Sequence, residues 1–294
     1  MNIDLVNRIK RIALIALASD DELVETLVLK GGNAIDLAYK PKNNTTSRTS
    51  YDLDYSIEEG DFNEWEGSVP LRIKKALDQT FLENGFVLID YRFLNKPKTI
   101  REELADFWGG YKVEFKVVDK EKFEENKENI DKNRRASIAI KPDHSPVFEI
   151  EFSKFEYIGQ KVPVTVDGYK IYVYTPEMIV FEKLRAICQQ LPGYKDVVPS
   201  FNPRARARDF YDIHLIMEMH RIDPAVKESV ELIQHIFDAK KVPLHFIKEI
   251  RNNKALHADN WQSVKDTVSP NEPLQDFDFY FNFVVNNFEN ITFL

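Results

Sequence analysis

Cysteine is nearly absent from this sequence of 294 residues, and long apolar runs are absent too. Cys188 is the only cysteine, which excludes an internal disulfide and a cysteine-rich zinc or iron–sulfur site, and which a reducing cytoplasm tolerates. No apolar stretch approaches the ~20 residues needed to span a bilayer. We therefore expect a globular cytoplasmic protein that makes no membrane contact.

Positive charge is also in short supply, since 40 Lys and Arg stand against 48 Asp and Glu, for a formal net charge of −8. The sequence therefore lacks a strongly basic domain, which is the simplest sign of a nucleic-acid-binding protein. Any phosphate-rich partner must be held by a local positive patch. Hydrophobic residues at 43% and charged residues at 30% are close to globular averages, which argues against disordered, collagen-like and coiled-coil proteins.

Basic residues near the N-terminus precede a short apolar stretch, Ile12 to Ala18, which faintly resembles a signal peptide. Apolar residues in this region also recur at helical spacing, at Leu5, Ile9, Ile12 and Ala16, with charged residues between them. An amphipathic first helix explains the same residues, and we favour it over a signal.

The first half of the chain alternates helical and strand-like patterns, whereas the last third is helical in its periodicity. This indicates an α/β (α+β) domain followed by a helical domain, and we expect them to span residues 1–174 and 175–294. Thr175-Pro176-Glu177 supports the boundary, because a cap residue, a proline and an early acid are typical of a helix start. We expect strands at 27–30, 51–57, 85–94, 111–118 and 146–155, a hairpin at 162–174, helices at 33–40, 62–83, 176–190, 204–220 and 224–240, a loop at 40–50, and a solvated charged segment at 120–135.

Two aspartates, Asp52 and Asp54, lie two residues apart on the strand predicted at 51–57. Positions two apart project from the same face of a strand, about 6.5–7 Å apart, so both carboxylates can reach the same divalent ions. Mg²⁺ or Mn²⁺ prefers oxygen ligands, and a pair of such ions can activate an attacking hydroxyl while neutralising a leaving phosphate. The alternative is two solvated acids on a strand face.

A glycine pair, Gly31-Gly32, lies about twenty residues upstream at a predicted junction between a strand and a helix. Glycines at such a junction let backbone N–H groups approach a phosphate, and the helix N-terminus behind them favours anions. The alternative is a simple tight turn. Lys30 and Arg48 either add positive charge to the same cleft or are ordinary surface cations.

A second acidic pair, Glu149 and Glu151, shares one face of the strand predicted at 146–155. Either could supply a third carboxylate to a two-metal site, and we favour Glu151. Two solvated acids remain the alternative. The six histidines have no metal-binding spacing, and Cys188 lies on the core face of its helix, where we expect it to be inert.

Lys183 interrupts the apolar stripe of the helix predicted at 176–190. Asp209 and Asp212 lie three apart on the following helix, on its apolar side, and buried carboxylates there need a cationic partner. The candidates for that partner are Lys183, Arg204, Arg206 and Arg208. The group either joins two helices as a structural ion pair or faces a polar cleft.

Four segments in order resemble the AbiEii/AbiGii toxin family, which belongs to the DNA polymerase β-like nucleotidyltransferase superfamily. They are Leu29-Lys30-Gly31-Gly32-Asn33-Ala34, Arg48-Thr49-Ser50-Tyr51-Asp52-Leu53-Asp54, Glu182-Lys183-Leu184-Arg185-Ala186 and Arg206-Ala207-Arg208-Asp209-Phe210-Tyr211-Asp212. The resemblance implies a nucleotidyltransferase core with a mixed sheet and a helical C-terminal part that completes the active-site cleft. It also implies the toxin of a bacterial abortive-infection or toxin–antitoxin pair, and hence a cognate antitoxin.

The resemblance also implies roles for individual residues. The metal-binding aspartates of the family fall on Asp52 and Asp54, its glycine pair on Gly31 and Gly32, its lysine and second acid on Lys183 and Asp209, and a serine beside the metal on Ser50. Asn33 departs from the usual threonine or serine after the glycines, and a long insertion separates Gln190 from Arg204. The insertion leaves the substrate open.

The mechanism that follows is a nucleotidyl transfer. Mg²⁺ held by Asp52 and Asp54 binds an NTP, whose triphosphate meets the Gly31-Gly32 amides, Lys183 and Arg48, and an acceptor hydroxyl attacks the α-phosphate and expels pyrophosphate. The resemblance suggests the 3′ end of tRNA as acceptor, with Arg204, Arg206 and Arg208 contacting its backbone. The alternatives are transfer to a protein or small molecule, and a binding module without turnover.

Overall fold

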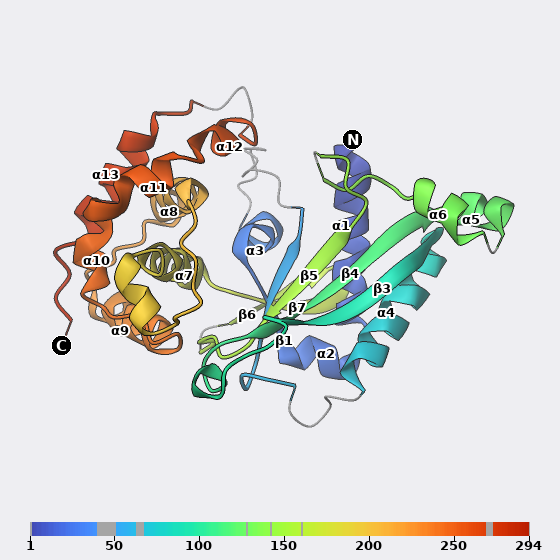
Figure 1. Ribbon diagram of the computed structural model, residues 1–294, viewed down its shortest axis with the longest axis horizontal. Helices are drawn as coiled ribbons and strands as arrows, with labels where there is room; N and C mark the ends of the chain where they lie inside the picture. Colours follow the sequence, from blue (N-terminus) through green and yellow to red (C-terminus); the bar gives the residue numbers. More distant parts are fainter. Residues whose placement is uncertain are drawn as a thin grey trace. The chain divides into compact units, whose positions relative to one another are not determined.

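The computed structural model describes residues 2–39, 51–62, 68–127, 129–141, 143–159, 161–268 and 273–293 (Figure 1). The chain divides into two compact units. The first comprises Met1–Asn33 and Ser50–Val173, and the second comprises Ala34–Thr49 and Tyr174–Leu294. The loop predicted at 40–50, with Arg48 and Ser50, lies outside the described residues.

The first unit is built on a seven-stranded sheet in the order β3-β4-β5-β2-β1-β7-β6. The strands are β1 Leu27–Lys30, β2 Leu53–Ile57, β3 Phe86–Lys96, β4 Gly110–Asp119, β5 Phe148–Ser153, β6 Val162–Val166 and β7 Tyr169–Val173. β1 pairs with β7 and β2 with β5 in parallel, while the other neighbours are antiparallel. The mixed sheet and the 162–174 hairpin are therefore confirmed.

The two faces of the sheet differ in polarity because side chains alternate along each strand. On β5, Phe148, Ile150 and Phe152 are buried, whereas the glutamates between them lie on the opposite face. Helices α1 (Ile3–Ala18) and α4 (Val69–Glu83) contact each other, and α4 also packs on β3 (Figure 1). Phe81 of α4 meets the ring of Phe115 edge-on at 5.6 Å, which places α4 over the apolar face. The opposite face is left for charged side chains.

Helix α3 (Gly31–Ala38) follows β1 without a connecting residue, so it begins at the first glycine instead of at residue 33. The other short helices of this unit are α2 Asp21–Thr26, η1 Glu102–Leu104, α5 Lys120–Asn126 and α6 Ile130–Arg135. The last two occupy the charged segment at 120–135. α4 begins at Val69, seven residues later than the predicted 62, and residues 63–67 lie outside the described part.

β2 is shorter at its start than the predicted strand 51–57, and Asp52 lies just before it. The antiparallel register between β1 and β2 ends at Lys30 opposite Asp54, because β1 turns into α3 at the next residue. The Asp52 carbonyl instead accepts a hydrogen bond from Asn33 Nδ2 at 2.5 Å. The prediction that both aspartates lie within the strand was therefore wrong for Asp52.

The second unit is helical in its described C-terminal part, which confirms the helical domain predicted there. Its elements are α7 Pro176–Cys188, η2 Pro192–Asp196, α8 Ala207–His220, α9 Lys227–Asp238, α10 Phe246–Glu249, η3 Ile250–Asn253, α11 Lys254–Ala258, α12 Trp261–Lys265 and α13 Phe277–Phe288. α7 starts as predicted, with Thr175 Oγ1 accepting from Met178 N at 3.3 Å. Cys188 is fully buried, and burial raises the pKa of its thiol, as expected of an inert cysteine. Among the described helices, none has the length and apolarity to cross a membrane.

Gly110 is required by the close pairing of β4 and β5. A Cβ added to it would lie 2.2 Å from the Phe152 carbonyl oxygen, so an alanine must push the two strands apart. We expect Gly110→Ala to lower the free energy of unfolding by about 3 kcal/mol. Gly168→Ala is the control, because that turn is open and alanine there meets only the positive φ of 88°, at a cost of about 1 kcal/mol. Equal losses in urea unfolding would contradict the steric explanation.

Candidate functional site

The junction between β1 and α3 brings a glycine against an aspartate. Gly31 has φ +67°, a left-handed conformation that favours glycine, and a Cβ there would lie 3.3 Å from Asp54 Oδ2. The absent side chain therefore permits both the turn and the approach of the Asp54 carboxylate. One glycine of the pair therefore lies beside one aspartate of the acidic motif.

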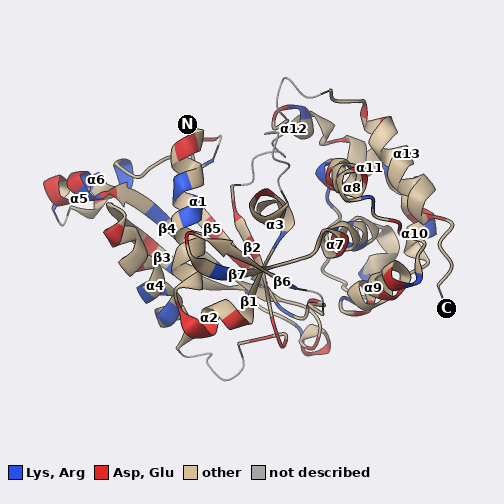
Figure 2. Ribbon diagram, turned by 180° about the vertical axis from the view of Figure 1, so that it is seen from behind, with Lys and Arg blue, Asp and Glu red and all other residues tan. Residues whose placement is uncertain are grey.

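Three of the four acids lie on neighbouring parallel strands, Asp54 on β2 and Glu149 and Glu151 on β5, with Asp54 directly opposite Glu151. Asp52 directly precedes β2 and approaches Glu149, since Lys141 contacts both carboxylates. Burial raises the pKa of Asp52, and the charges of Glu149 and Glu151 add to the increase. The structure therefore brings together the acids that the sequence pointed to, on one face of the sheet. Figure 2 marks acidic residues in red and basic residues in blue along the ribbons of both units.

Lysines neutralise these acids. Lys141 lies between two of them, with Nζ 3.3 Å from Asp52 Oδ1 and an ion pair to Glu149. Burial works to raise the pKa of Glu149, but hydrogen bonds from Lys141 and from Lys112 Nζ, the latter at 2.9 Å, outweigh it and lower the pKa. Glu151 forms an ion pair with Lys96. Sequence reasoning missed Lys141, because its link to Asp52 joins positions far apart in the chain.

Lys30 is buried, so it is not an ordinary surface cation. It is 8% exposed, and its Nζ lies 3.1 Å from Ser153 Oγ and 3.5 Å from Glu156 Oε1. An ammonium in such a position costs free energy unless it is paired, so these contacts explain how it is tolerated. Lys30 therefore joins β1 to the segment that follows β5.

The acidic residues fit a divalent cation of the kind that nucleotides carry. Within the described ranges, no three acidic, histidine or cysteine residues are arranged as a ready-made metal site. Mg²⁺ at nucleotide sites is held by one or two carboxylates together with phosphate oxygens and water, so Asp52 and Asp54 suffice. Glu151 is the nearest further donor by strand register, opposite Asp54. A cation at Asp52 would meet the Lys141 ammonium, which lies 3.3 Å from Asp52 Oδ1.

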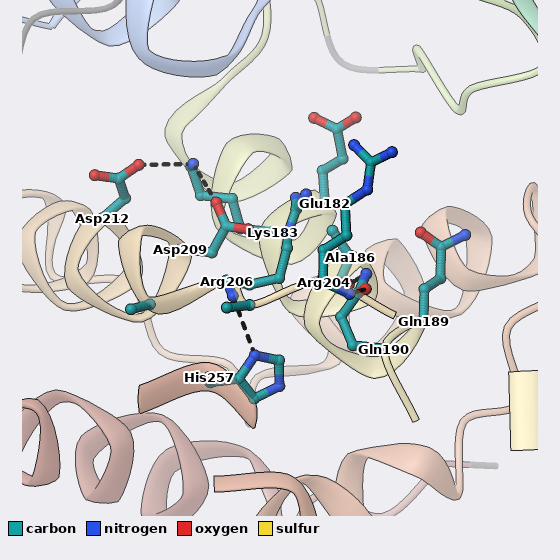
Figure 3. Close-up of polar contacts among 12 residues, drawn as sticks. Glu182, Lys183, Ala186, Gln189, Gln190, Arg204, Arg206, Asp209, Asp212 and His257 are labelled. Carbon is teal, nitrogen blue, oxygen red and sulfur yellow. Dashed lines mark hydrogen bonds and ion pairs between the residues drawn. The ribbon is translucent and has the colours of Figure 1, made fainter. Parts of the chain in front are cut away.

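The second unit contains its own buried charge cluster, drawn in Figure 3. Lys183 Nζ of α7 donates to Asp209 Oδ1 at 2.9 Å and to Asp212 Oδ2 at 2.7 Å, both on α8. Arg206 Nε adds an ion pair to Asp209 at 2.5 Å. Lys183 is thus the cation that the two aspartates need, as one of the sequence alternatives proposed. The assignment of Lys183 and Asp209 to nucleotide handling stays a prediction.

The segment before α8 is irregular instead of helical, and side chains from other segments hold its peptide groups. Arg204 N donates to Gln190 Oε1 at 2.8 Å, and Arg206 N donates to His257 Nδ1 at 3.2 Å. Asn260 Oδ1 accepts a hydrogen bond from Ala207 N at 3.1 Å, and Asn260 Nδ2 donates one to the Ala205 carbonyl at 3.2 Å. α8 therefore begins at Ala207 and not at the predicted residue 204.

The three arginines of this segment differ in their surroundings. Arg204 is exposed, Arg206 is tied to Asp209, and Arg208 Nη2 lies 3.5 Å from the Ser263 carbonyl. His257 and Asn260, which fix the segment, were missed, because no spacing in the sequence marks them. The peptide groups of residues 205–207 are therefore held by residues more than fifty positions downstream, whereas that of Arg204 is held by Gln190.

One family model covers most of the chain. Described as the nucleotidyl transferase AbiEii toxin of a type IV toxin–antitoxin system, it matches residues 12–283. None of the curated proteins compared with the sequence matches it.

Solved structures from two organisms are similar to the chain at low identity. JHP933 from Helicobacter pylori is 17% identical, with 96% of this chain and 90% of that one covered and a TM-score of 0.48. A candidate nucleotidyltransferase from H. pylori is 16% identical, with 97% of this chain and 93% of that one covered and a TM-score of 0.49. An antigenic nucleotidyltransferase-like protein from Paracoccidioides brasiliensis is 13% identical, with 88% of this chain and 93% of that one covered and a TM-score of 0.35.

The buried imidazole of His257 predicts a dependence of stability on pH. Burial lowers its pKa from 6.5 to about 4, with Arg206 contributing and Asp209 opposing. Between these values the unfolded chain binds a proton that the folded protein does not, so the free energy of unfolding falls as the pH falls, by up to about 3 kcal/mol. Burial also lowers the pKa values of His214 and His220, which add to the slope.

Urea unfolding of the wild type and His257→Gln from pH 7 to pH 4 isolates the contribution of His257. We expect a shallower slope in the variant, with the remainder due to the other two rings and to carboxylates such as Glu149, whose pKa is lowered in the fold. His245→Gln, at a histidine whose side chain is 67% exposed, should keep the wild-type slope. Parallel curves for the wild type and His257→Gln would show that His257 is not the titrating group.

Proposed function

This chain belongs to the AbiEii family of nucleotidyl transferase toxins of type IV toxin–antitoxin systems, and we propose that it moves a nucleoside monophosphate from an NTP to a hydroxyl of RNA. The observation that carries the proposal is the placement of Asp54 against Gly31, with Asp52 two residues away and Glu151 opposite. Acids beside a glycine turn at a helix start suit a substrate that brings phosphates and a divalent cation.

Asp52 and Asp54 would hold Mg²⁺ or Mn²⁺ in this proposal, with Glu151 as third ligand and Glu149 as the alternative. A cation bound there supplies neutralisation of phosphate charge and a lowered pKa for the attacking hydroxyl. The N–H groups of Gly31 and Gly32 open α3, where the first N–H groups of a helix have no helical partner and favour an anion. These residues position the triphosphate so that the acceptor attacks the α-phosphate in line and pyrophosphate leaves.

We propose the 3′ end of tRNA as the acceptor. Arg204, Arg206 and Arg208 offer cations for its phosphates, and Arg204 is the most exposed of them. A cytoplasmic location suits both substrates and the single buried cysteine. Because the family is the toxin of a type IV pair, a cognate antitoxin is the expected partner.

Transfer of label from NTPs tests the reaction. The protein is incubated with each α-³²P-labelled NTP, Mg²⁺ and total tRNA, and the label on RNA, protein and small molecules is separated. We expect label on tRNA, and a loss of more than about 100-fold in Asp52→Asn and Asp54→Asn, because each removes a ligand charge from the cation. Asp131→Asn is the matched control, since that side chain is 74% exposed on α6 and should keep full activity.

Other outcomes separate the alternatives. Label on protein or a small molecule would replace RNA as the acceptor. A lack of transfer to any acceptor, together with an unchanged melting temperature in Mg²⁺-NTP, would identify a binding module without turnover. Transfer that survives Asp52→Asn would refute the metal site.

Lys141 should compete with a divalent cation for Asp52. Its ammonium lies 3.3 Å from Asp52 Oδ1, so its removal frees that oxygen and removes a nearby positive charge. We expect Lys141→Gln to strengthen Mn²⁺ binding severalfold in titrations followed by electron paramagnetic resonance. Lys116→Gln is the control for charge, because it lies on the same sheet but pairs with Asp90. Equal effects of both variants would attribute the change to net charge alone.

A further inference from the structure

Lys10 is a buried cation on the apolar side of α1. It is 7% exposed, and its neighbours on that side, Ile9, Ala13 and Leu14, are buried hydrophobic residues. Burial of an ammonium is unfavourable unless hydrogen-bond acceptors replace the lost water. A lysine at this position therefore needs a partner that the packing of α1 alone does not supply.

Asn33 is a partner of Lys10, and its amide also forms a hydrogen bond to Asp52. Lys10 Nζ donates to Asn33 Oδ1 at 3.3 Å, and Asn33 Nδ2 donates to the Asp52 carbonyl at 2.5 Å. The orientation of the amide is fixed by chemistry, since a lysine can only donate and a carbonyl can only accept. Asn33 is itself 5% exposed, so the amide is sheltered from competing water.

This contact reaches Asp52 where strand pairing does not. The registers of β2 with β1 and with β5 begin no earlier than Leu53, so the ladder does not fix the Asp52 peptide. Asn33 lies two residues after Gly31, whose missing side chain admits the Asp54 carboxylate. The first turn of α3 thus contacts both aspartates, one through a carbonyl and the other through a carboxylate.

We propose that Lys10 and Asn33 are positioning residues that fix the peptide of Asp52, so that its carboxylate is held in place for the cation. The proposal rests on the proposed function, since it gives Asp52 a ligand role. Neither residue touches the reacting atoms. Lys10 orients and polarises the Asn33 amide, and Asn33 restrains the residue that precedes β2.

Asn33→Leu tests the relay, by which we mean the hydrogen bonds from Lys10 to Asn33 and from Asn33 to the Asp52 carbonyl. Leucine has a similar size and no hydrogen-bonding groups. The measurements are hydrogen exchange of residues 51–57 in metal-free protein and the affinity and line shape of bound Mn²⁺ by electron paramagnetic resonance. We expect faster exchange at 52–54, Mn²⁺ binding weaker on the order of tenfold, and a broader Mn²⁺ signal.

Asn33→Leu removes one hydrogen-bond acceptor from the buried Lys10 ammonium and could unfold the protein. The double variant Lys10→Met/Asn33→Leu replaces both polar partners by apolar groups of similar volume and should keep the wild-type melting temperature within a few degrees. We expect it to show the same exchange and Mn²⁺ changes. Arg11→Met is the control, because it removes the same charge from the next residue of α1, which pairs with Asp167 at the surface.

The outcomes distinguish the relay from the proposed function. Wild-type exchange at 52–54 in a folded double variant would overturn the relay, as would wild-type Mn²⁺ affinity in that variant. Failure of the wild type to bind Mn²⁺ at a site sensitive to Asp54→Asn would overturn the metal site instead. In that case the exchange rates alone decide whether Lys10 and Asn33 hold Asp52.

Discussion

Repulsion among carboxylates is the constraint on which the first unit depends. The parallel register of β2 and β5 puts Asp54 opposite Glu151 and brings Asp52 toward Glu149 on one face of the sheet. Two like charges 4 Å apart repel by about 4 kcal/mol at the dielectric of a protein surface, so the face must be neutralised. Lysines from three other parts of the chain meet these acids, namely Lys96 of β3, Lys112 of β4 and Lys141 before β5. Lysine ammonium groups therefore supply the positive charge on this face of the sheet.

The second unit also pairs carboxylates with cations, but its charged groups are buried between two helices. There a single buried lysine, Lys183, faces two aspartates, and Arg206 supplies the second positive charge at Asp209. Removing one partner of such a group leaves a buried charge, at about 3–5 kcal/mol, whereas the intact group adds little stability beyond an apolar core. The cluster therefore fixes α7 against α8 more than it strengthens the unit. The peptide groups just before α8 have no helical partners, so side chains such as Gln190 and His257 hold them instead.

Local signals in the sequence predicted most of the elements, because each depends on a few adjacent residues. The pattern over 146–155 placed Glu149 and Glu151 on one face of β5, the pattern over 162–174 predicted the hairpin of β6 and β7, and Thr175-Pro176 predicted the start of α7. The same reasoning put the acidic residues on one face, since the period of a strand is two. It could not supply the sheet order or the register that aligns two acidic strands, which depend on pairings between distant segments.

The errors and omissions at the site share that origin. Asp52 falls outside β2 because β1 ends at Lys30, and the sequence around Asp52 carries no sign of where its partner strand stops. Asn33 stood out only as a departure from the threonine or serine expected after the glycines. The Asn33 amide accepts from Lys10 through its oxygen and donates to the Asp52 carbonyl through its nitrogen. The hydroxyl of a threonine or serine would have to accept and donate through a single oxygen on a shorter side chain. The departure at Asn33 and the buried lysine in α1 therefore belong to one chain of hydrogen bonds, which ends at the Asp52 carbonyl.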